Sequence, residues 1–171
     1  MPIDISQLLR AAGGEIVGKV RLQKAVYLLD QIGLQSGFDF DYHHYGPYSA
    51  ELADAVDESI AFGTVRETSG RRVADGVPYS VFRAEDHDEA GPRPVQIGGM
   101  MSTDVATALS KMNTHSSTVL ELAATIHWLA YVEEDEDWRD ELVRRKGIKA
   151  DAKRTTEALR LLADLDLSPN G

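Results

Sequence analysis

Residues 42–56 read YHHYGPYSAELADAV, and this stretch decides how the first half of the chain is arranged. Pro47 fixes its own φ and biases Gly46 away from the helical region, so the chain changes direction here. Ser49 is a favourable N-cap for the helix that the following residues, SAELADAVDESIAFG, predict. We therefore interpret the stretch as an elbow that ends an extended segment and begins a helix.

Two helices and an extended segment are predicted before the elbow. A short helix over Ile5–Ala12, capped by Asp4 or Ser6, is followed by a longer helix over residues 18–33, whose apolar residues recur at helical spacing. In the next stretch, FDFDYH, aromatic residues alternate with polar ones, which is typical of a half-buried extended chain. The elbow closes that segment.

Two strands and four helices are predicted after the elbow helix. The strands form a ribbon over Arg66–Phe82, with a turn at Ser69-Gly70, and a polar connector rich in glycine and proline follows. The helices are expected over residues 102–112 (with Ser102 or Thr103 as cap), 116–132, 138–146 and 149–165.

The order of these elements indicates the fold class. Three helices followed by a two-stranded ribbon is the order of a winged helix, with the ribbon as the wing. We therefore predict a mainly α (α+β) protein. A winged-helix-like module over residues 1–85 is joined by a connector over residues 86–103 to a helical C-terminal half over residues 104–171, and the two halves pack as one compact unit.

Bulk composition excludes several classes of protein. The 171 residues include no cysteine, so disulfides, thiolate metal sites and cysteine nucleophiles are impossible. The formal net charge is -10, which repels the phosphate backbone of nucleic acids on average. The N-terminus shows no signal pattern, and no apolar run approaches the roughly 18 residues that span a bilayer. We expect a cytoplasmic protein without membrane contact.

Several segments together resemble a known group of proteins. These are LQKAVYLL (22–29), YHHYGPYS (42–49), AELADAVDESIAFGTV (50–65) and LELAATIHWL (120–129), followed by a C-terminal helix. In this order they resemble the YwgA-like family of small bacterial proteins and, in the same way, the Panacea (SocA-like) antitoxin domain, over roughly residues 15–165. The Panacea resemblance implies neutralisation of a toxin by direct contact, or an adaptor that delivers the toxin to a protease. The form YGPYS is closer to the YwgA-like branch, which implies no particular activity or cofactor.

The elbow could in principle be a catalytic or metal site, and the residue pattern favours neither. His43 and His44 are adjacent on an extended chain, so they point to opposite faces and cannot easily share an ion. The polar residues around His87 predict that it is exposed, so we do not choose it as a metal ligand. The chain has no GxSxG, P-loop, HExxH or dinucleotide fingerprint. We read His127, alone on an apolar helix, as a satisfied core residue. We expect neither an enzyme nor a cofactor.

Nucleic-acid binding is the alternative function. The helix that normally enters the major groove carries Glu51, Asp54, Asp57 and Glu58 here, with no Lys or Arg. Binding would therefore have to use the basic wing, through Arg66, Arg71 and Arg72. We regard this route as the less favoured one.

Protein binding is the favoured function. Tyrosines are enriched at the centres of interfaces, and Tyr45 and Tyr48 flank the elbow. The seven basic residues between Arg139 and Arg154 are either a self-neutralised surface or a basic groove for an acidic partner. We predict a regulatory interaction module whose partner is a toxin or a regulatory target. Its predicted contact residues are Lys24, Tyr27, Tyr45, Gly46, Pro47, Tyr48 and Ser49.

Overall fold

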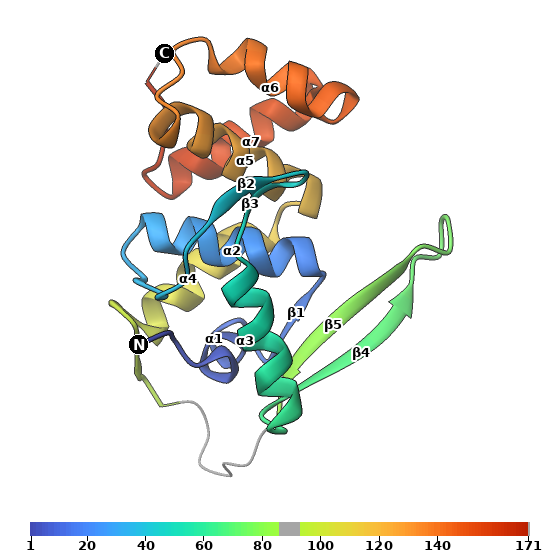
Figure 1. The fold of residues 1–171 in the computed structure, drawn as a ribbon, viewed down its shortest axis with the longest axis vertical. Helices are drawn as coiled ribbons and strands as arrows, with labels where there is room; N and C mark the ends of the chain where they lie inside the picture. Colours follow the sequence, from blue (N-terminus) through green and yellow to red (C-terminus); the bar gives the residue numbers. More distant parts are fainter. Residues whose placement is uncertain (86–92, 171) are drawn as a thin grey trace.

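The computed structural model describes residues 1–85 and 93–170, and it combines helices with small antiparallel sheets (Figure 1). The architecture is therefore α+β. In the first half, the elements are α1 (Ile5–Ala11), β1 (Glu15–Val17), α2 (Lys19–Gln31), β2 (Asp41–His43), β3 (Gly46–Tyr48), α3 (Ala50–Ala61), β4 (Val65–Arg71) and β5 (Pro78–Ala84).

The second half contains helices and one short hairpin. Its elements are β6 (Gln96–Ile97), β7 (Met100–Met101), α4 (Ser102–Asn113), α5 (Ser117–His127), a π-helical turn (Trp128–Val132), α6 (Trp138–Lys146), a 3₁₀ turn (Gly147–Ala150) and α7 (Ala152–Asp164). No helix among the described residues is long and apolar enough to cross a membrane.

Helix α2 is the centre of the core. Every residue from Leu22 to Leu29 is buried, so the helix is covered on all sides and not only along one apolar stripe. Helices α4 and α5 and strand β3 pack around it, and Figure 1 places it in the middle of the molecule. Two polar residues, Gln23 and Lys24, are consequently enclosed with the apolar ones and need partners inside the protein.

The wing is part of a larger sheet than the sequence predicts. Strand β5 pairs with β4 on one edge and with the short strand β1 on the other, in the order β1-β5-β4. The predicted turn at Ser69-Gly70 is wrong, because Ser69 pairs with Ser80 and Gly70 with Tyr79. The chain reverses later, where Gly76 adopts a φ of 71°. The ring of Tyr79 covers Gly70, which explains a glycine inside the strand.

The elbow is a β-hairpin. The sequence predicts that Gly46-Pro47 breaks an extended segment, but residues Gly46–Tyr48 form β3 and pair antiparallel with β2. Pro47 is compatible with this hairpin because a small two-stranded sheet consists of edge strands alone. Ser49 then caps α3 as predicted, its Oγ accepting a hydrogen bond of 3.1 Å from the backbone N–H of Leu52.

The other elements follow the predicted order with some differences, and the last helix, predicted from residue 149, begins at Ala152 after a 3₁₀ turn. Helix α4 begins at Ser102 without a side-chain cap, because the Ser102 hydroxyl accepts a hydrogen bond from the Val95 N–H instead. The described part of the connector includes the β6–β7 hairpin, whereas residues 86–92, with His87, lie outside the described residues. The long predicted helix changes from α to π geometry at Trp128.

Tyr27 and His127 tie the two halves of the chain together in the core. The Tyr27 hydroxyl lies 2.8 Å from Nδ1 of His127, and both side chains are buried. The Tyr27 ring also meets Phe40 edge-on at 5.4 Å, and His127 stacks on Tyr131 at 4.7 Å. The expectation that His127 is a satisfied core residue is confirmed. Burial lowers the pKa of His127 to about 4.

His127 should make the protein acid-sensitive. Between pH 7 and pH 5 the unfolded chain takes up a proton at this residue, because its ordinary pKa is 6.5, while the folded protein does not. We therefore expect the free energy of unfolding to fall by about 2 kcal/mol over this range. Urea unfolding at both pH values measures the change. The His127→Asn variant, whose amide can still meet Tyr27, should lack most of it, and equal falls in both proteins would contradict the assignment.

Candidate functional site

An open groove of about 1150 Å³ lies between the β4–β5 hairpin and helix α3, with the start of α2 as its floor. Leu52 and Val56 of α3 form one wall, and Phe82 with Val77 forms part of the other. Tyr45, Tyr48 and Lys24 belong to its lining at the end nearest the elbow. The groove therefore connects the two features, elbow and wing, that the sequence singled out separately.

A buried amide fixes the elbow to α2. Gln23 Nε2 donates to the Ser49 carbonyl and Gln23 Oε1 accepts from the Ser49 N–H, both at 2.9 Å. Both residues are buried, so the Ser49 N–H would lack a partner without Gln23, whereas the Ser49 carbonyl also accepts a hydrogen bond of 3.2 Å from the Ala53 N–H. The start of α3 is thus held in one position relative to α2.

Lys24, the residue that follows Gln23 in α2, also holds the elbow. Its side chain is only 1% exposed, and its ammonium donates a short hydrogen bond to the Pro47 carbonyl. Burial lowers the pKa of Lys24 to about 8, with Glu121 opposing the change and Lys146 adding to it. A buried cation thus lies at the junction of groove and elbow.

Gly46 allows the hairpin to approach α5 closely. Its φ is 92°, and a Cβ atom there would lie 2.7 Å from Oγ1 of Thr125. That hydroxyl donates to the Glu121 carbonyl at 2.8 Å, so it has little freedom to move away. Only glycine satisfies both the conformation and the contact.

Glu121 is a buried carboxylate shared by two lysines, Lys146 and Lys149. We call Glu121 and the three lysines Lys24, Lys146 and Lys149 the lysine cluster. Glu121 is 2% exposed, and its Oε2 lies 3.5 Å from Nζ of Lys146 and 3.3 Å from Nζ of Lys149. Lys146 also donates to the His44 carbonyl at 3.4 Å. Burial lowers the pKa of Lys146, and Glu121 partly offsets this. The hairpin is therefore attached to the C-terminal half through a cation.

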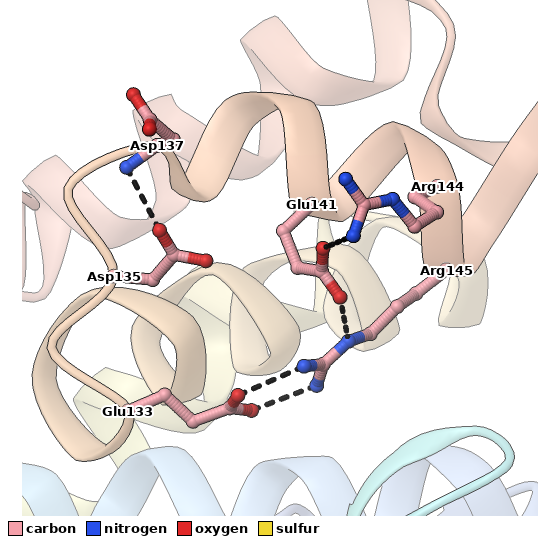
Figure 2. A network of polar contacts seen from close by, with 6 residues as sticks. All are labelled: Glu133, Asp135, Asp137, Glu141, Arg144 and Arg145. Atoms are coloured by element: carbon pink, nitrogen blue, oxygen red, sulfur yellow. Dashed lines mark hydrogen bonds and ion pairs between the residues drawn. The ribbon is translucent and has the colours of Figure 1, made fainter.

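Next to the lysine cluster, Arg145 is fully engaged by carboxylates. Figure 2 shows its guanidinium making two parallel bonds to Glu133, at 2.7 and 2.8 Å, and a third bond of 2.7 Å to Glu141. Arg144 pairs with the second oxygen of Glu141 at 2.8 Å. This part of the C-terminal basic run is the self-neutralised surface that the sequence offered as one alternative.

Two tyrosines of the hairpin face these cations. The Arg145 guanidinium lies 4.5 Å from the ring centre of Tyr42, and Nζ of Lys149 lies 5.0 Å from that of Tyr45. Tyr45 is 51% exposed, so one side of its ring contacts Lys149 while the side chain remains accessible at the groove. Burial raises the pKa of Tyr42.

The predicted contact residues divide into two groups. Tyr45 and Tyr48 reach the surface and line the groove, while the others are enclosed. The enclosed residues position the two tyrosines from inside, because each packs or bonds within the elbow or the core. They are Lys24, Tyr27, Gly46, Pro47 and Ser49.

Two of the three arginines predicted for nucleic-acid binding are paired with carboxylates. Arg66 pairs with Glu85, and Arg72 pairs with Asp75 at 2.8 Å. Arg71 donates to the Gly76 carbonyl at 3.0 Å. Each charged pair leaves little net field, and the carboxylates of α3 are exposed across the groove.

The two histidines of the elbow contact different tyrosines. The ring of His43 lies 4.9 Å from that of Tyr48, and the ring of His44 lies 4.9 Å from that of Tyr45. Among residues 1–85 and 93–170, no group of three or more histidine, aspartate or glutamate side chains is placed to hold a metal ion.

Sequence reasoning missed Gln23, Glu121, Lys146 and Lys149 as parts of one site. A usable signal existed for Glu121, which is the one carboxylate in the apolar stretch VLELAATI and therefore needs a partner when buried. Its partners lie 25 and 28 residues further along the chain, so no local spacing could identify them.

Replacing Gly46 tests the close approach of hairpin and α5. We expect Gly46→Ala to lower the free energy of unfolding by about 3 kcal/mol, since the positive φ and the Thr125 contact both oppose a side chain. Gly63→Ala is the matched control, because Gly63 has a φ of 79° but open space around it. Its loss should be about 1 kcal/mol in the same denaturation experiment, and equal losses would contradict the packing argument.

Replacing Glu121 tests the lysine cluster. Glu121→Gln leaves the Lys146 ammonium, whose side chain is 3% exposed, without its counter-charge, so we expect a loss of about 3 kcal/mol in unfolding free energy. Glu133→Gln removes a carboxylate whose side chain is 35% exposed and should lose about 1 kcal/mol or less. Thermal or urea unfolding of both variants makes the comparison, and a loss as small for Glu121 as for Glu133 would show that the buried charge is not needed.

Comparison with known proteins finds similarity to an uncharacterised protein. No family model matches the sequence. A curated protein of Bacillus subtilis (strain 168), the uncharacterised protein YwgA, is 26% identical over 152 residues, which cover 89% of each chain. The resemblance to YwgA-like proteins is thereby supported over nearly the whole length, and the chain is similar to YwgA in both halves.

Proposed function

We propose that this protein is a non-enzymatic interaction module, antitoxin- or adaptor-like, that binds a segment of a partner protein in the groove between hairpin and α3. The observation that carries the proposal is the groove itself. At about 1150 Å³ it exceeds the roughly 300–1,000 Å³ of pockets that enclose small molecules. An open groove, unlike an enclosed pocket, can take an extended or helical polypeptide segment.

The exposed residues of the groove are of the kind that stabilise protein interfaces. Tyr45 is 51% exposed, Val77 43% and Tyr79 38%, and all three belong to the lining. Aromatic side chains contribute large contact areas at small cost in side-chain entropy, and they dominate the energetics of many interfaces. We propose that burial of these side chains drives the binding of the partner.

The fixed elbow supports the same function. Gln23, Lys24 and Gly46 hold the hairpin from below, so Tyr45 and Tyr48 are positioned before a partner arrives. A preformed surface loses little conformational entropy on binding, which raises affinity without additional contacts.

A winged-helix-like arrangement of residues 1–85 is the finer part of the fold proposal. Its support is the order α1-β1-α2-β2-β3-α3-β4-β5, which is that of a winged helix with the β2–β3 hairpin inserted between α2 and α3, and the pairing of β1 with the wing strand β5. The exposed carboxylates of α3 and the paired arginines of the wing favour a protein over a nucleic acid as the ligand. The Panacea resemblance adds a class of partner, a toxin or another regulatory target, and we place the interaction in the cytoplasm.

A pull-down with groove variants tests the proposal. The tagged protein is incubated with lysate of its own host, with and without nuclease, and the retained protein is identified and quantified. We expect one stoichiometric protein that survives nuclease, and at least a tenfold loss of affinity in Tyr45→Ala combined with Tyr79→Ala, because both exposed rings line the groove.

Phe62→Ala is the matched control for that experiment. Phe62 is 77% exposed at the end of α3, and it does not belong to the lining of the groove. Its substitution should leave the affinity unchanged. Equal losses in control and groove variants would reject the groove as the binding surface. A nucleic acid retained without protein, and lost with nuclease, would favour the basic wing.

A further inference from the structure

We propose that Lys24 forms a carboxylate-binding subsite at the elbow end of the groove, so that the segment bound there combines apolar side chains with an acidic residue. This inference deepens the proposed function and rests on it for the identity of the ligand as a polypeptide. The subsite itself is a property of the described residues and can be tested alone.

Lys24 has hydrogen-bonding capacity to spare. An ammonium carries three N–H groups, and within the described part of the chain the Pro47 carbonyl is the acceptor that it reaches. Glu121 acts on it electrostatically, but lies beyond ion-pair distance in the described structure. A cation that is 1% exposed and incompletely bonded is unfavourable unless an anion joins it.

The charges around Lys24 also favour an anion. The lysine cluster contains three ammonium groups, Lys24, Lys146 and Lys149, and one carboxylate, Glu121, so it carries an excess of two positive charges. The whole chain has a net charge of -10, so the cluster is a positively charged site in a negatively charged protein. A carboxylate of the partner would reduce the excess to one.

The approach to the subsite selects the kind of anion. Leu52, Val56 and Tyr48 line the groove together with Lys24, and Asp57 lines it as well. A phosphate carries more charge than a carboxylate, so it would lose more hydration among these apolar residues and be repelled more strongly by Asp57. A side-chain carboxylate on an apolar polypeptide segment brings one charge together with a surface that the groove can bury.

Two small molecules with one apolar body serve as probes. The probes are 4-phenylbutyrate and 4-phenylbutyramide, which differ in the carboxylate alone, and the readout is the ¹H–¹³C signals of Leu52, Val56 and the Lys24 Cε. We expect millimolar binding at pH 7, with a dissociation constant at least tenfold lower for the carboxylate. Binding of the two probes with equal affinity would overturn the subsite.

Two variants separate Lys24 from the other groove lysine. Lys24→Gln removes the charge but keeps a donor for the Pro47 carbonyl, so it should abolish the preference for the carboxylate. Lys19→Gln makes the same change at the exposed lysine of the groove and should keep the preference. Loss of the preference in Lys19→Gln, with retention in Lys24→Gln, would assign the site to Lys19 and overturn the proposal.

A pH series needs no variant and covers the case in which Lys24→Gln does not fold. The pKa of Lys24 is lowered to about 8, so at pH 9.3 most of its ammonium is neutral. Glu121 on α5 and Lys146 on α6 are the charged groups that act on it. The carboxylate preference should fall several-fold between pH 7 and pH 9.3, and a constant preference would contradict the role of Lys24.

Further outcomes distinguish the occupants. Tighter binding of inorganic phosphate than of 4-phenylbutyrate at the same signals would overturn the carboxylate assignment. Shifts of the groove signals on concentration of the protein alone would identify a second copy as the occupant and overturn it too. If the probes bind as expected but the pull-down retains no partner, the subsite stands and the proposed function fails. A partner retained equally by the wild type and Lys24→Gln would support the proposed function and contradict the subsite.

Discussion

The enclosure of α2 on all sides is the constraint from which the rest of the structure follows. A helix that buries Leu22 to Leu29 without interruption also buries Gln23 and Lys24, and these must find partners inside the protein. The partners are the Ser49 backbone and the Pro47 carbonyl, both in the elbow. The hairpin and the start of α3 therefore have one available position, and the groove wall that they form is fixed with them.

This arrangement buries the ammonium of Lys24 inside the protein, where desolvation of a charge costs free energy. An amide or an apolar residue at position 24 could hold or fill the same space with less desolvation, so stability alone does not explain a lysine. Glu121 offsets part of the cost, yet it is already shared by Lys146 and Lys149. A site that remains positively charged in a chain of net charge -10 is best explained by an anionic ligand.

Local sequence patterns identified most elements but not their connections. The helical spacing of the LQKAVYLL stretch, the Ser49 cap and the amphipathic C-terminal helices depend on neighbours within a few residues, and the structure contains them. Strand β1 is three residues long and forms only because β5 offers an edge. Tyr27 and His127 are 100 residues apart, so no periodic pattern in the sequence could predict their hydrogen bond. The site was missed for the same reason, because Lys24 and Glu121 belong to different halves.

The β2–β3 hairpin contacts both halves of the chain. Pro47 is bonded to Lys24 of α2, Gly46 lies against Thr125 of α5, and the His44 carbonyl accepts from Lys146 of α6. Tyr45, at the turn, lies both on the groove and 5.0 Å from Lys149. Because the Lys24 and Gly46 contacts are close and buried, a change in the shape of the hairpin would break bonds elsewhere. The partner that we propose would therefore have to fit a preformed elbow, and a segment that displaced Tyr45 would alter the surroundings of Lys149 in the lysine cluster.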